Sequence, residues 1–369
     1  MKQDILVVGA GIWGCTVARI LAERGHKVHV IEKRAAIGGN CRCETDPETG
    51  IEVHVYGSHI FHTSNVRVWE FLNRFTTFNG YTHKVLARHA GRTYFLPLGL
   101  ALVNQYYGID LKPSEVASFI AEKAGAADEP PRNFEEQAIR FVGPDLYAAF
   151  IREYTRKQWN CAPKDLPAEI IRRLPVRASY DINYFNDLYQ GIPTDGYNVL
   201  FARMLDHENI RVSLNEEFVL PAETDRPIYS SAPIDALFGY TFGALTWRSL
   251  RFETERLALA DYQGTSVVNY VDADVAWTRI HEFKHYHPED RTALAAPATV
   301  ISKEFPADWE PGAEPYYPVE TPETRAKLAQ YREEAAKYPN LVVGGRLGAF
   351  KYYDMDKAVA AAFAAVGEE

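Results

Sequence analysis

Residues 4–32 read DILVVGAGIWGCTVARILAERGHKVHVIE, and this stretch decides the fold of the N-terminal part of the chain. The apolar run Asp4–Val8 predicts a buried strand, and the periodic apolar residues of Ile12–Arg24 predict a helix that ends before Gly25. A second strand is predicted at Lys27–Glu32. The order strand, helix, strand predicts a parallel βαβ unit.

The turn between the first strand and the helix contains Gly9, Gly11 and Gly14. Glycines at this spacing permit the tight turn, let the backbone approach a pyrophosphate, and allow the helix to pack closely on the strand. The N-terminus of the helix offers free N–H groups and a partial positive charge to the phosphates. Glu32 ends the second strand, where a carboxylate accepts hydrogen bonds from a ribose. The pattern predicts a dinucleotide-binding site.

Two further glycine pairs favour FAD over NAD as the dinucleotide. Gly38-Gly39 follows Glu32 closely, as in the pyrophosphate loops of flavoproteins. Near the other end of the chain, Gly344-Gly345 follows a short apolar strand and precedes a helix that starts near Asp354. An ordinary turn is the alternative for this second pair. A helix N-terminus facing the flavin would stabilise its anionic reduced form.

The bulk properties of the 369 residues indicate a globular protein, since 47% of them are hydrophobic. A net charge of -9, without a basic block, argues against a nucleic-acid partner. We expect a cytoplasmic protein without membrane insertion, because no leader or long apolar run is visible. No metal is expected, since neither Cys41-x-Cys43 nor the His59 to His62 stretch has a second ligand pair. Four free thiols are expected at Cys15, Cys41, Cys43 and Cys161.

The remaining periodicities predict the fold class: α/β, with a Rossmann-type FAD-binding domain, an inserted helical domain and an antiparallel β-sheet domain. The expected boundaries are 1–97 with 335–369 and parts of 205–245 for the FAD-binding domain, 98–207 for the helical substrate domain with a mobile loop, and 246–334 for the sheet domain. Other expected elements are a strand-like Ile51–His62, a helix capped by Ser64, strands at Ser249–Leu257, Ser266–Val271, Trp277–Phe283 and Leu341–Val343, and helices at 322–338 and Met355–Val366.

A substrate site is indicated by aromatic residues at helical spacing. Phe150 and Tyr154 are four residues apart, as are Thr155 and Trp159, so a flat heterocycle could stack on this ledge. A core stripe is the alternative interpretation. Arg279 lies in a predicted strand among apolar residues, where an arginine usually needs an anion.

Taken together, these residues resemble the bacterial UDP-galactopyranose mutases. The resembling segments run nearly from end to end and are Ile31–Arg34, Ile37–Asn40, Tyr56–Thr63, Tyr154–Trp159, 174–177, Glu314–Pro318, Gly345–Gly348 and Asp354–Asp356. The chain departs from the family pattern at Ser58, where Pro is frequent, at Phe350, where some members have Tyr, and at Lys351, where some have Arg. The surroundings of the flavin are therefore expected to differ.

The resemblance implies a role for each motif residue. It places Arg173 and Arg279 on the substrate diphosphate and His62 beside the isoalloxazine, as the catalytic residues. The implied substrate contacts are Phe150, Tyr154, Thr155, Trp159, Tyr184, Asn269, Tyr316 and Tyr352, with Phe150 and Tyr154 at the uracil and the three other tyrosines on phosphate oxygens. The implied FAD contacts are Gly9, Gly11, Gly14, Glu32, Lys33, Gly39, Asn40, His59, Arg346, Asp354 and Met355.

The implied reaction interconverts UDP-galactopyranose and UDP-galactofuranose, with NAD(P)H or a reductase as electron donor and a homodimer as the assembly. Reduced flavin N5 would attack C1 of the sugar, UDP would leave, and the ring would reclose after an iminium stage, with no net redox change. Two other classes stay open: a flavin oxidoreductase of the amine-oxidase type, and a carrier resembling the GDP-dissociation inhibitors.

Overall fold

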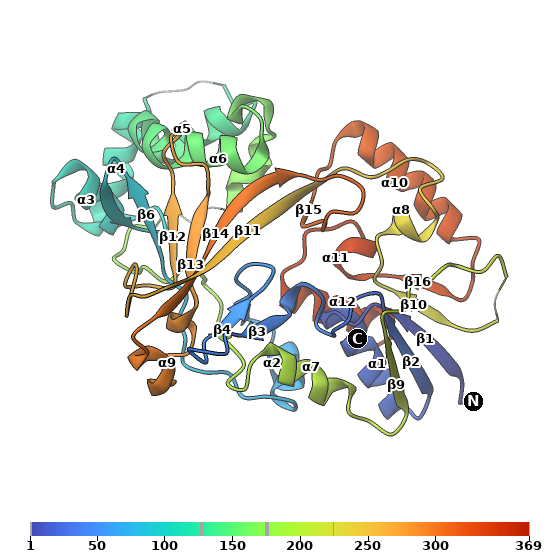
Figure 1. Cartoon of the computed structure of the whole chain (residues 1–369). Coiled ribbons are helices and arrows are strands. Elements are labelled where there is room, and N and C mark those ends of the chain that lie inside the picture. The colour runs from blue at the N-terminus through green and yellow to red at the C-terminus, as the bar shows by residue number, and fades with distance from the viewer. Residues whose placement is uncertain (1, 126–128, 174–176, 224, 369) are drawn as a thin grey trace.

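The computed structural model describes residues 2–125, 129–173, 177–223 and 225–368, apart from the side chains of Glu169, Arg172 and Arg173. Figure 1 shows two lobes connected by two long strands, β11 (Trp247–Leu257) and β14 (Thr299–Asp308). Both ends of the chain lie on the same lobe.

The lobe with the chain ends is built on a five-stranded parallel sheet in the order β16-β10-β1-β2-β9. Its strands are β1 (Asp4–Val8), β2 (Lys27–Glu32), β9 (Ile210–Leu214), β10 (Ile228–Ser230) and β16 (Leu341–Val343). The first, middle and last parts of the chain therefore share one sheet. The predicted Rossmann-type unit is confirmed.

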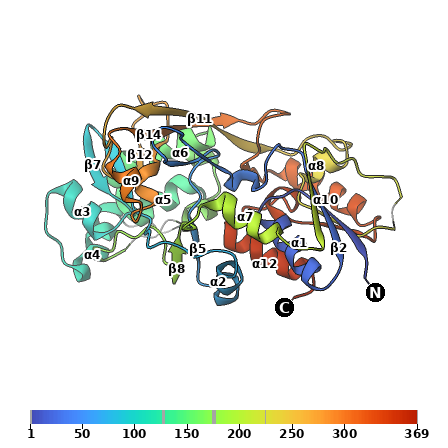
Figure 2. The ribbon, with the colours of Figure 1, turned by 60° about the horizontal axis from the view of Figure 1, so that its bottom comes forward.

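Helices from distant parts of the sequence cover this sheet. Figure 2 shows α7 (Tyr197–Leu205) and α12 (Met355–Ala365) beside α1 (Ile12–Glu23). The buried faces of all three contribute to one apolar core. Although the sequence assigns residues 197–205 to the helical insertion, α7 packs in the Rossmann-type lobe. The other elements near this lobe are α2 (Val66–Asn73), α8 (Ile234–Leu237), α10 (Pro322–Ala335) and α11 (Gly345–Gly348).

A seven-stranded sheet, in the order β15-β11-β14-β13-β12-β6-β7, forms the second layer. Its other strands are β6 (Val85–His89), β7 (Arg92–Phe95), β12 (Val267–Tyr270), β13 (Arg279–Glu282) and β15 (Tyr317–Pro318). All pairs are antiparallel except β12 with β6, which is parallel. The antiparallel sheet is confirmed, but it includes residues 85–95, which we expected within the first segment of the FAD-binding domain.

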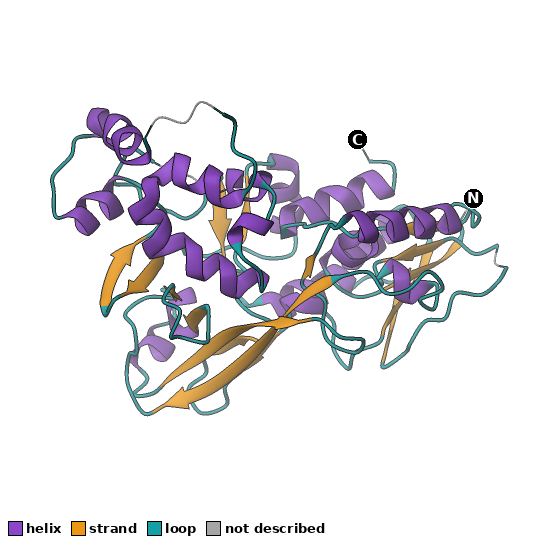
Figure 3. Cartoon of the chain, turned by 90° about the horizontal axis from the view of Figure 1, so that it is seen from above, coloured by secondary structure: helices purple, strands orange, loops and turns teal. Residues whose placement is uncertain are grey.

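A group of helices lies at the end of this sheet that is far from the Rossmann-type lobe (Figure 3). The group contains α3 (Leu100–Tyr107), α4 (Pro113–Ala124), α5 (Phe134–Leu146), a π-helical turn at Tyr147–Ile151, α6 (Arg152–Trp159) and 3-10 turns at Pro163–Asp165 and 168–173. Its core includes residues of β6 and β7, such as Ala87 and Tyr94. The helical insertion is therefore anchored on the edge of the sheet.

Two local predictions were wrong. The expected strand at Ile51–His62 is split into β4 (Glu52–His54) and β5 (Phe61–Thr63), with a turn between them at Gly57, whose φ is +86°. β4 pairs with β3 (Cys43–Thr45), and β5 pairs with β8 (Tyr189–Gly191). The cap of α2 is Asn65 instead of Ser64, because the Asn65 side chain accepts from the N–H of Val68.

The last elements are the short helix α9 (Arg291–Ala295) and two 3-10 turns, Gly39–Cys41 and Phe283–Tyr286. Within the described ranges, no helix has the length and apolar character needed to cross a bilayer.

Candidate active site

The glycine loop after β1 has the geometry of a dinucleotide cradle. Gly9 has a φ of +94°, and a Cβ there would lie 2.3 Å from Oγ of Ser231. A Cβ on Gly14 would lie 2.0 Å from the carbonyl oxygen of Gly9, so only glycine lets α1 approach β1 this closely. Gly11 caps α1 without a side chain, which leaves the positive end of the helix open to an anion.

The carboxylate of Glu32, at the end of β2, accepts hydrogen bonds from the glycine loop after β1 and from the loop after β2. Its Oε2 accepts from the N–H of Ala10 at 2.8 Å, and its Oε1 accepts from the N–H of Arg34 at 2.9 Å. The residue is 6% exposed. Each carboxylate oxygen accepts more than one hydrogen bond, so these contacts leave capacity for two ribose hydroxyls.

The second glycine loop closes over the first. The N–H of Gly38 donates to the carbonyl of Ala10 at 2.8 Å, and the Cα atoms of Gly11 and Gly39 face each other, since a Cβ on Gly39 would lie 3.1 Å from Cα of Gly11. Asn40 lies in the following 3-10 turn, and its Oδ1 accepts from Nη2 of Arg34 at 2.8 Å.

Arg34 is a site residue that sequence reasoning missed, although it belongs to the quoted motif 31–34. Its Nη2 also pairs with Oε2 of Glu314 at 2.5 Å, and its guanidinium lies 4.6 Å from the ring centre of Tyr56. It therefore connects the expected pyrophosphate loop to the large sheet. The adjacent Lys33 is exposed.

The C-terminal Gly-Gly turn packs against the N-terminal loop. A Cβ on Gly344 would lie 2.3 Å from the Trp13 ring, and a Cβ on Gly345, whose φ is +71°, would lie 3.2 Å from Cβ of Ser231. The guanidinium of Arg346 donates from Nε to the carbonyl of Tyr353 at 3.0 Å. These contacts fix the segment that leads into α12.

The N-terminus of α12 lies beside the 3-10 turn of the cofactor loop. Asp354 occupies the N-cap position without a side-chain capping bond, and Sδ of Met355 lies 3.6 Å from Sγ of Cys41. His59 donates from Nδ1 to the carbonyl of Gly57 at 2.7 Å. Burial lowers the pKa of His59 to about 3, so the ring is neutral and its Nε2 is an acceptor.

Arg279 of β13 occupies the centre of the second group of predicted residues. Its Nη2 donates to the hydroxyl of Tyr154 at 2.7 Å, and its Nε forms an ion pair with Oε1 of Glu304 at 3.1 Å. Although burial opposes the shift, Glu304 raises the pKa of Arg279 well above its ordinary value. Asn269 stands opposite Arg279 in the β12–β13 pairing. The site therefore presents a permanent cation.

Further tyrosines act on this cation. Tyr317 and Tyr184 both contribute to the electrostatic field at Arg279, and Tyr352 stacks on Tyr317 with ring centres 5.6 Å apart. The guanidinium of Arg346 lies 5.3 Å from the Tyr352 ring, so this tyrosine connects the expected cofactor side to the cationic side. Tyr184 and Tyr352 are 38% and 43% exposed.

Tyr316 does not join this group. It is 4% exposed, and its ring faces Phe252 at 6.1 Å. Its electrostatic neighbours include Tyr56 and Arg34, which belong to the cofactor side. Its ring centre lies 6.3 Å from that of Tyr317, which acts electrostatically on Arg279, so the contact expected for Tyr316 stays a prediction.

The aromatic ledge of Phe150, Tyr154, Thr155 and Trp159 is only partly exposed to solvent. Phe150 is 5% exposed, and its ring meets Tyr94 at 5.1 Å and Tyr106 at 5.5 Å in the helical core. Tyr154, Thr155 and Trp159 lie on α6, where Thr155 is buried and the two aromatic residues are half-buried. Phe150 is therefore part of the helical core, with Tyr154 and Trp159 packed against it, and stacking of a heterocycle on this ledge stays a prediction.

Lys157 has a structural contact that the sequence did not indicate. Its Nζ donates to the carbonyls of Tyr270 at 2.7 Å and of Asp272 and Val275 at 3.0 Å. It therefore holds the turn between β12 and β13.

His62 lies on β5, where Asp187 and Phe185 determine its orientation. Its Nδ1 lies 2.7 Å from Oδ2 of Asp187, and its ring stacks on Phe185 with centres 3.6 Å apart. Asp187 is a second residue that sequence reasoning missed, and no motif marks it. Arg173 ends a 3-10 turn, and its side chain lies outside the described part of the structure.

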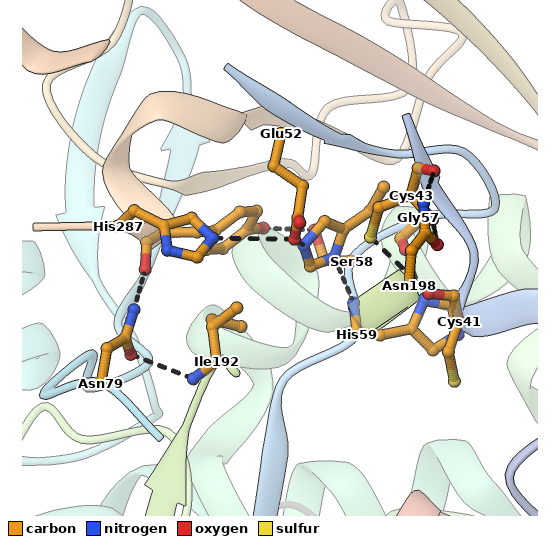
Figure 4. A network of polar contacts seen from close by, with 12 residues as sticks. Cys41, Cys43, Glu52, Gly57, Ser58, His59, Asn79, Ile192, Asn198 and His287 are labelled. Atoms are coloured by element: carbon orange, nitrogen blue, oxygen red, sulfur yellow. Dashed lines mark hydrogen bonds and ion pairs between the residues drawn. The ribbon is translucent and has the colours of Figure 1, made fainter. Parts of the chain in front are cut away.

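A buried polar network lies beneath the loop at 57–59. Figure 4 shows Glu52 reaching His287, and Oε1 of Glu52 is 3.6 Å from Nε2 of both His287 and His54. Cys43, Glu52 and His54 offer ligand atoms within 4.8 Å of one another. However, Nδ1 of His54 accepts from the N–H of His59 at 3.0 Å, so neutral His54 carries its proton on Nε2. This tautomer argues against a metal ion at these three residues.

Comparisons with known proteins agree with the resemblance seen in the sequence, and the relatives below align over nearly the whole chain. A family model described as UDP-galactopyranose mutase matches residues 149–352, and a model described as NAD(P)-binding Rossmann-like domain matches residues 7–75. The chain is 41% identical to a dTDP-fucopyranose mutase from Escherichia coli, over 97% of this chain and 96% of that protein. It is 40% identical to a probable UDP-galactopyranose mutase from Klebsiella pneumoniae, over 100% and 94%.

Solved structures support the fold. Reduced UDP-galactopyranose mutase aligns with a TM-score of 0.76 and 16% identity, over 100% of this chain and 96% of that one. A putrescine oxidase variant aligns less well, with a TM-score of 0.57 and 13% identity, over 99% and 98%. The predicted resemblance is confirmed.

Proposed function

Because this chain belongs to the UDP-galactopyranose mutase family, we propose that it interconverts UDP-galactopyranose and UDP-galactofuranose with reduced FAD as its cofactor. The observation that carries the proposal is the position of Arg279. This cation donates to the hydroxyl of Tyr154 and is influenced electrostatically by Tyr184 and Tyr317. Tyr352 stacks on Tyr317 and lies against Arg346 on the expected cofactor side. A nucleotide-sugar diphosphate and a flavin would therefore meet at Tyr352.

The residues present fit FAD. The cradle formed by Gly9, Gly11 and Gly14 has no room for a Cβ on Gly14, and the open end of α1 favours a pyrophosphate. Glu32 would accept the adenosine ribose, while Gly39 and Asn40 would line the pyrophosphate. On the other side, Arg346 and the N-terminus of α12 would face the flavin ring.

The chain supplies no activated nucleophile of its own among its cysteines. Burial raises the pKa of Cys41 to about 12 and raises the pKa values of Cys15, Cys43 and Cys161 as well, so all four thiols stay protonated at neutral pH. Ring contraction needs the bond between C1 of the sugar and the diphosphate to break and form again. When bound and reduced, FAD would supply N5 as the nucleophile for C1.

The protein's task is then to bind and orient the diphosphate. Arg279 neutralises charge on the leaving diphosphate, and Tyr317, Tyr184 and Tyr352 donate O–H bonds to its oxygens. Burial raises the pKa of Tyr352, and burial also raises that of Tyr317, so both remain donors. We assign the second arginine of the resemblance, Arg173, to the same diphosphate, and His62, held by Asp187, to the isoalloxazine.

A second substrate has a specific observation in its favour. The identity to the dTDP-fucopyranose mutase, 41%, equals that to the probable UDP-galactopyranose mutase within one percentage point. Both sugars need the same ring contraction. The oxidoreductase alternative rests on fold similarity at 13% identity, which carries no activity.

The test is product analysis with both substrates side by side. Purified enzyme reduced with dithionite should convert UDP-galactopyranose to the furanose form, detected by chromatography and NMR. Faster conversion of dTDP-fucopyranose would assign the chain to the second substrate, and no ring isomerisation of either would refute a mutase function.

A further inference from the structure

Ser58 is one of the positions at which the sequence departs from the family pattern, and its hydroxyl lies at the centre of a buried hydrogen-bond chain. Oγ of Ser58 lies 2.5 Å from Nδ1 of His281, and it also contacts the hydroxyl of Tyr286. His281 is 1% exposed and Tyr286 is fully buried. Solvent therefore has little access to the His281 and Tyr286 atoms that contact Ser58.

The direction of each hydrogen bond follows from the far side of His281. Its Nε2 lies 3.1 Å from Oε2 of Glu304, which is 5% exposed. Although burial opposes the shift, Arg279 lowers the pKa of Glu304, so its carboxylate is an acceptor and Nε2 must carry the proton. Burial lowers the pKa of His281, so the ring is neutral and Nδ1 is left as an acceptor.

Ser58 must then donate to Nδ1 of His281 and accept from the hydroxyl of Tyr286. The other tautomer of His281 would point the lone pair of Nε2 at the Glu304 carboxylate, and the two would repel each other. The other carboxylate oxygen of Glu304, Oε1, pairs with Nε of Arg279 at 3.1 Å. The hydrogen-bond chain therefore runs from the loop at 57–59 through His281 to Glu304, and an ion pair joins Glu304 to Arg279 in the candidate site.

We propose that Ser58 is a positioning residue for substrate binding, which orients Arg279 through His281 and Glu304. The proposal rests on the proposed function, because it gives Arg279 the diphosphate as its ligand. The loop that carries Ser58 also carries His59, which the resemblance places at the flavin. The hydroxyl of Ser58 thus links the cofactor side of the site to the group that binds the leaving diphosphate.

The test measures binding of UDP, and separately of dTDP, to the FAD-loaded enzyme. Ser58→Ala removes the donor to Nδ1, and loss of one neutral hydrogen bond corresponds to a roughly two- to tenfold higher Kd. Ser58→Thr retains the hydroxyl and should restore the affinity of the wild type. FAD content should stay unchanged in both variants.

The matched control is Ser249→Ala in β11, which removes a buried hydroxyl that donates to the carbonyl of Glu314 at 2.7 Å in the same sheet. Its nucleotide affinity should equal that of the wild type. In a double-mutant cycle, Ser58→Ala and His281→Asn should be less than additive, since both interrupt the same chain.

Unchanged nucleotide affinity in Ser58→Ala, or full additivity with His281→Asn, would overturn this role. If Ser58→Ala does not fold, Ser58→Cys keeps a weaker donor, and its Kd should lie above that of the wild type. A wild-type affinity in that variant would also overturn the role. A wild-type enzyme that binds UDP but forms no furanose product would refute the proposed function alone, because the binding comparison does not depend on turnover.

Discussion

Nη2 of Arg279 donates to the hydroxyl oxygen of Tyr154 across 2.7 Å, and this bond joins β13 of the large sheet to α6 of the helical group. The two residues come from different layers of the fold. The cation is thus held between the ledge expected for the base and the sheet that carries Glu304.

Arg279→Lys should lower kcat/KM by about 100-fold or more, because an ammonium keeps the charge but not the fork that binds the diphosphate, Glu304 and Tyr154 together. FAD content should be unchanged. Steady-state kinetics with reduced enzyme measures the effect. Arg251→Lys, on the exposed part of β11, is the control and should match the wild type. An equal loss in both variants would show that Arg279 has no special role.

Removing the hydroxyl from each of the two adjacent tyrosines, Tyr316 and Tyr317, should have different effects on KM. Tyr317→Phe should raise KM for the nucleotide sugar by roughly 10-fold, since a donor to a charged oxygen contributes about 1.5 kcal/mol. Tyr316→Phe should leave KM near the wild-type value, because that hydroxyl lies on the Arg34 side. The reverse result would return the substrate contact to Tyr316.

The two tyrosines also show what sequence alone could and could not predict. β1, β2 and β16 were predicted residue for residue, because buried parallel strands appear as continuous apolar runs. Whether Tyr316 or Tyr317 acts on Arg279 depends on the pairing of β15 with β11, which begins at Tyr317. That choice is set by long-range packing and not by local pattern.

The same limit applies to pairings between distant segments. β6 joins β12 across more than 170 residues, and nothing in residues 85–95 indicates that partner. Glu304 faces Arg279 because of the β13–β14 register, and Asp187 reaches His62 from a loop. The glycine motifs were predictable because a side chain at most of these positions would clash with neighbouring atoms or would need an unfavourable φ.

Glu32→Ala should weaken FAD retention. Without the carboxylate, the charge-assisted hydrogen bonds to the ribose, worth roughly 1.5–3 kcal/mol, are lost. The hydrogen bond from the N–H of Ala10 is lost as well. Flavin absorbance per protein after gel filtration and dilution gives the occupancy. Glu44→Ala, an exposed acid on β3, is the control. Full occupancy in Glu32→Ala would contradict the ribose assignment.

Lowering the pH should destabilise the fold through His83. Burial lowers the pKa of His83 to about 3, below the value of about 6.5 in an unfolded chain. A group with a lowered folded-state pKa contributes stability above pH 6.5 and loses it as the pH falls toward 3, at about 1.4 kcal/mol per pH unit. His83→Gln should lack this component.

The measurement is the free energy of unfolding of the wild type and His83→Gln, followed from pH 7 downward. The wild type should lose stability relative to the variant as the pH falls. His26→Gln, at a half-exposed ring, serves as the control for the substitution itself. A difference between wild type and His83→Gln that does not change with pH would show that His83 is not buried in its neutral form.

The central claim is that a redox cofactor serves a reaction without net oxidation. The most direct measurement compares one enzyme preparation, loaded with FAD, in its oxidised form under air and in its dithionite-reduced form without oxygen, with UDP-galactopyranose or dTDP-fucopyranose as substrate. The account predicts furanose product only with the reduced enzyme, over many turnovers for each reduction. Full activity of the oxidised enzyme, or consumption of one reductant per product, would contradict it.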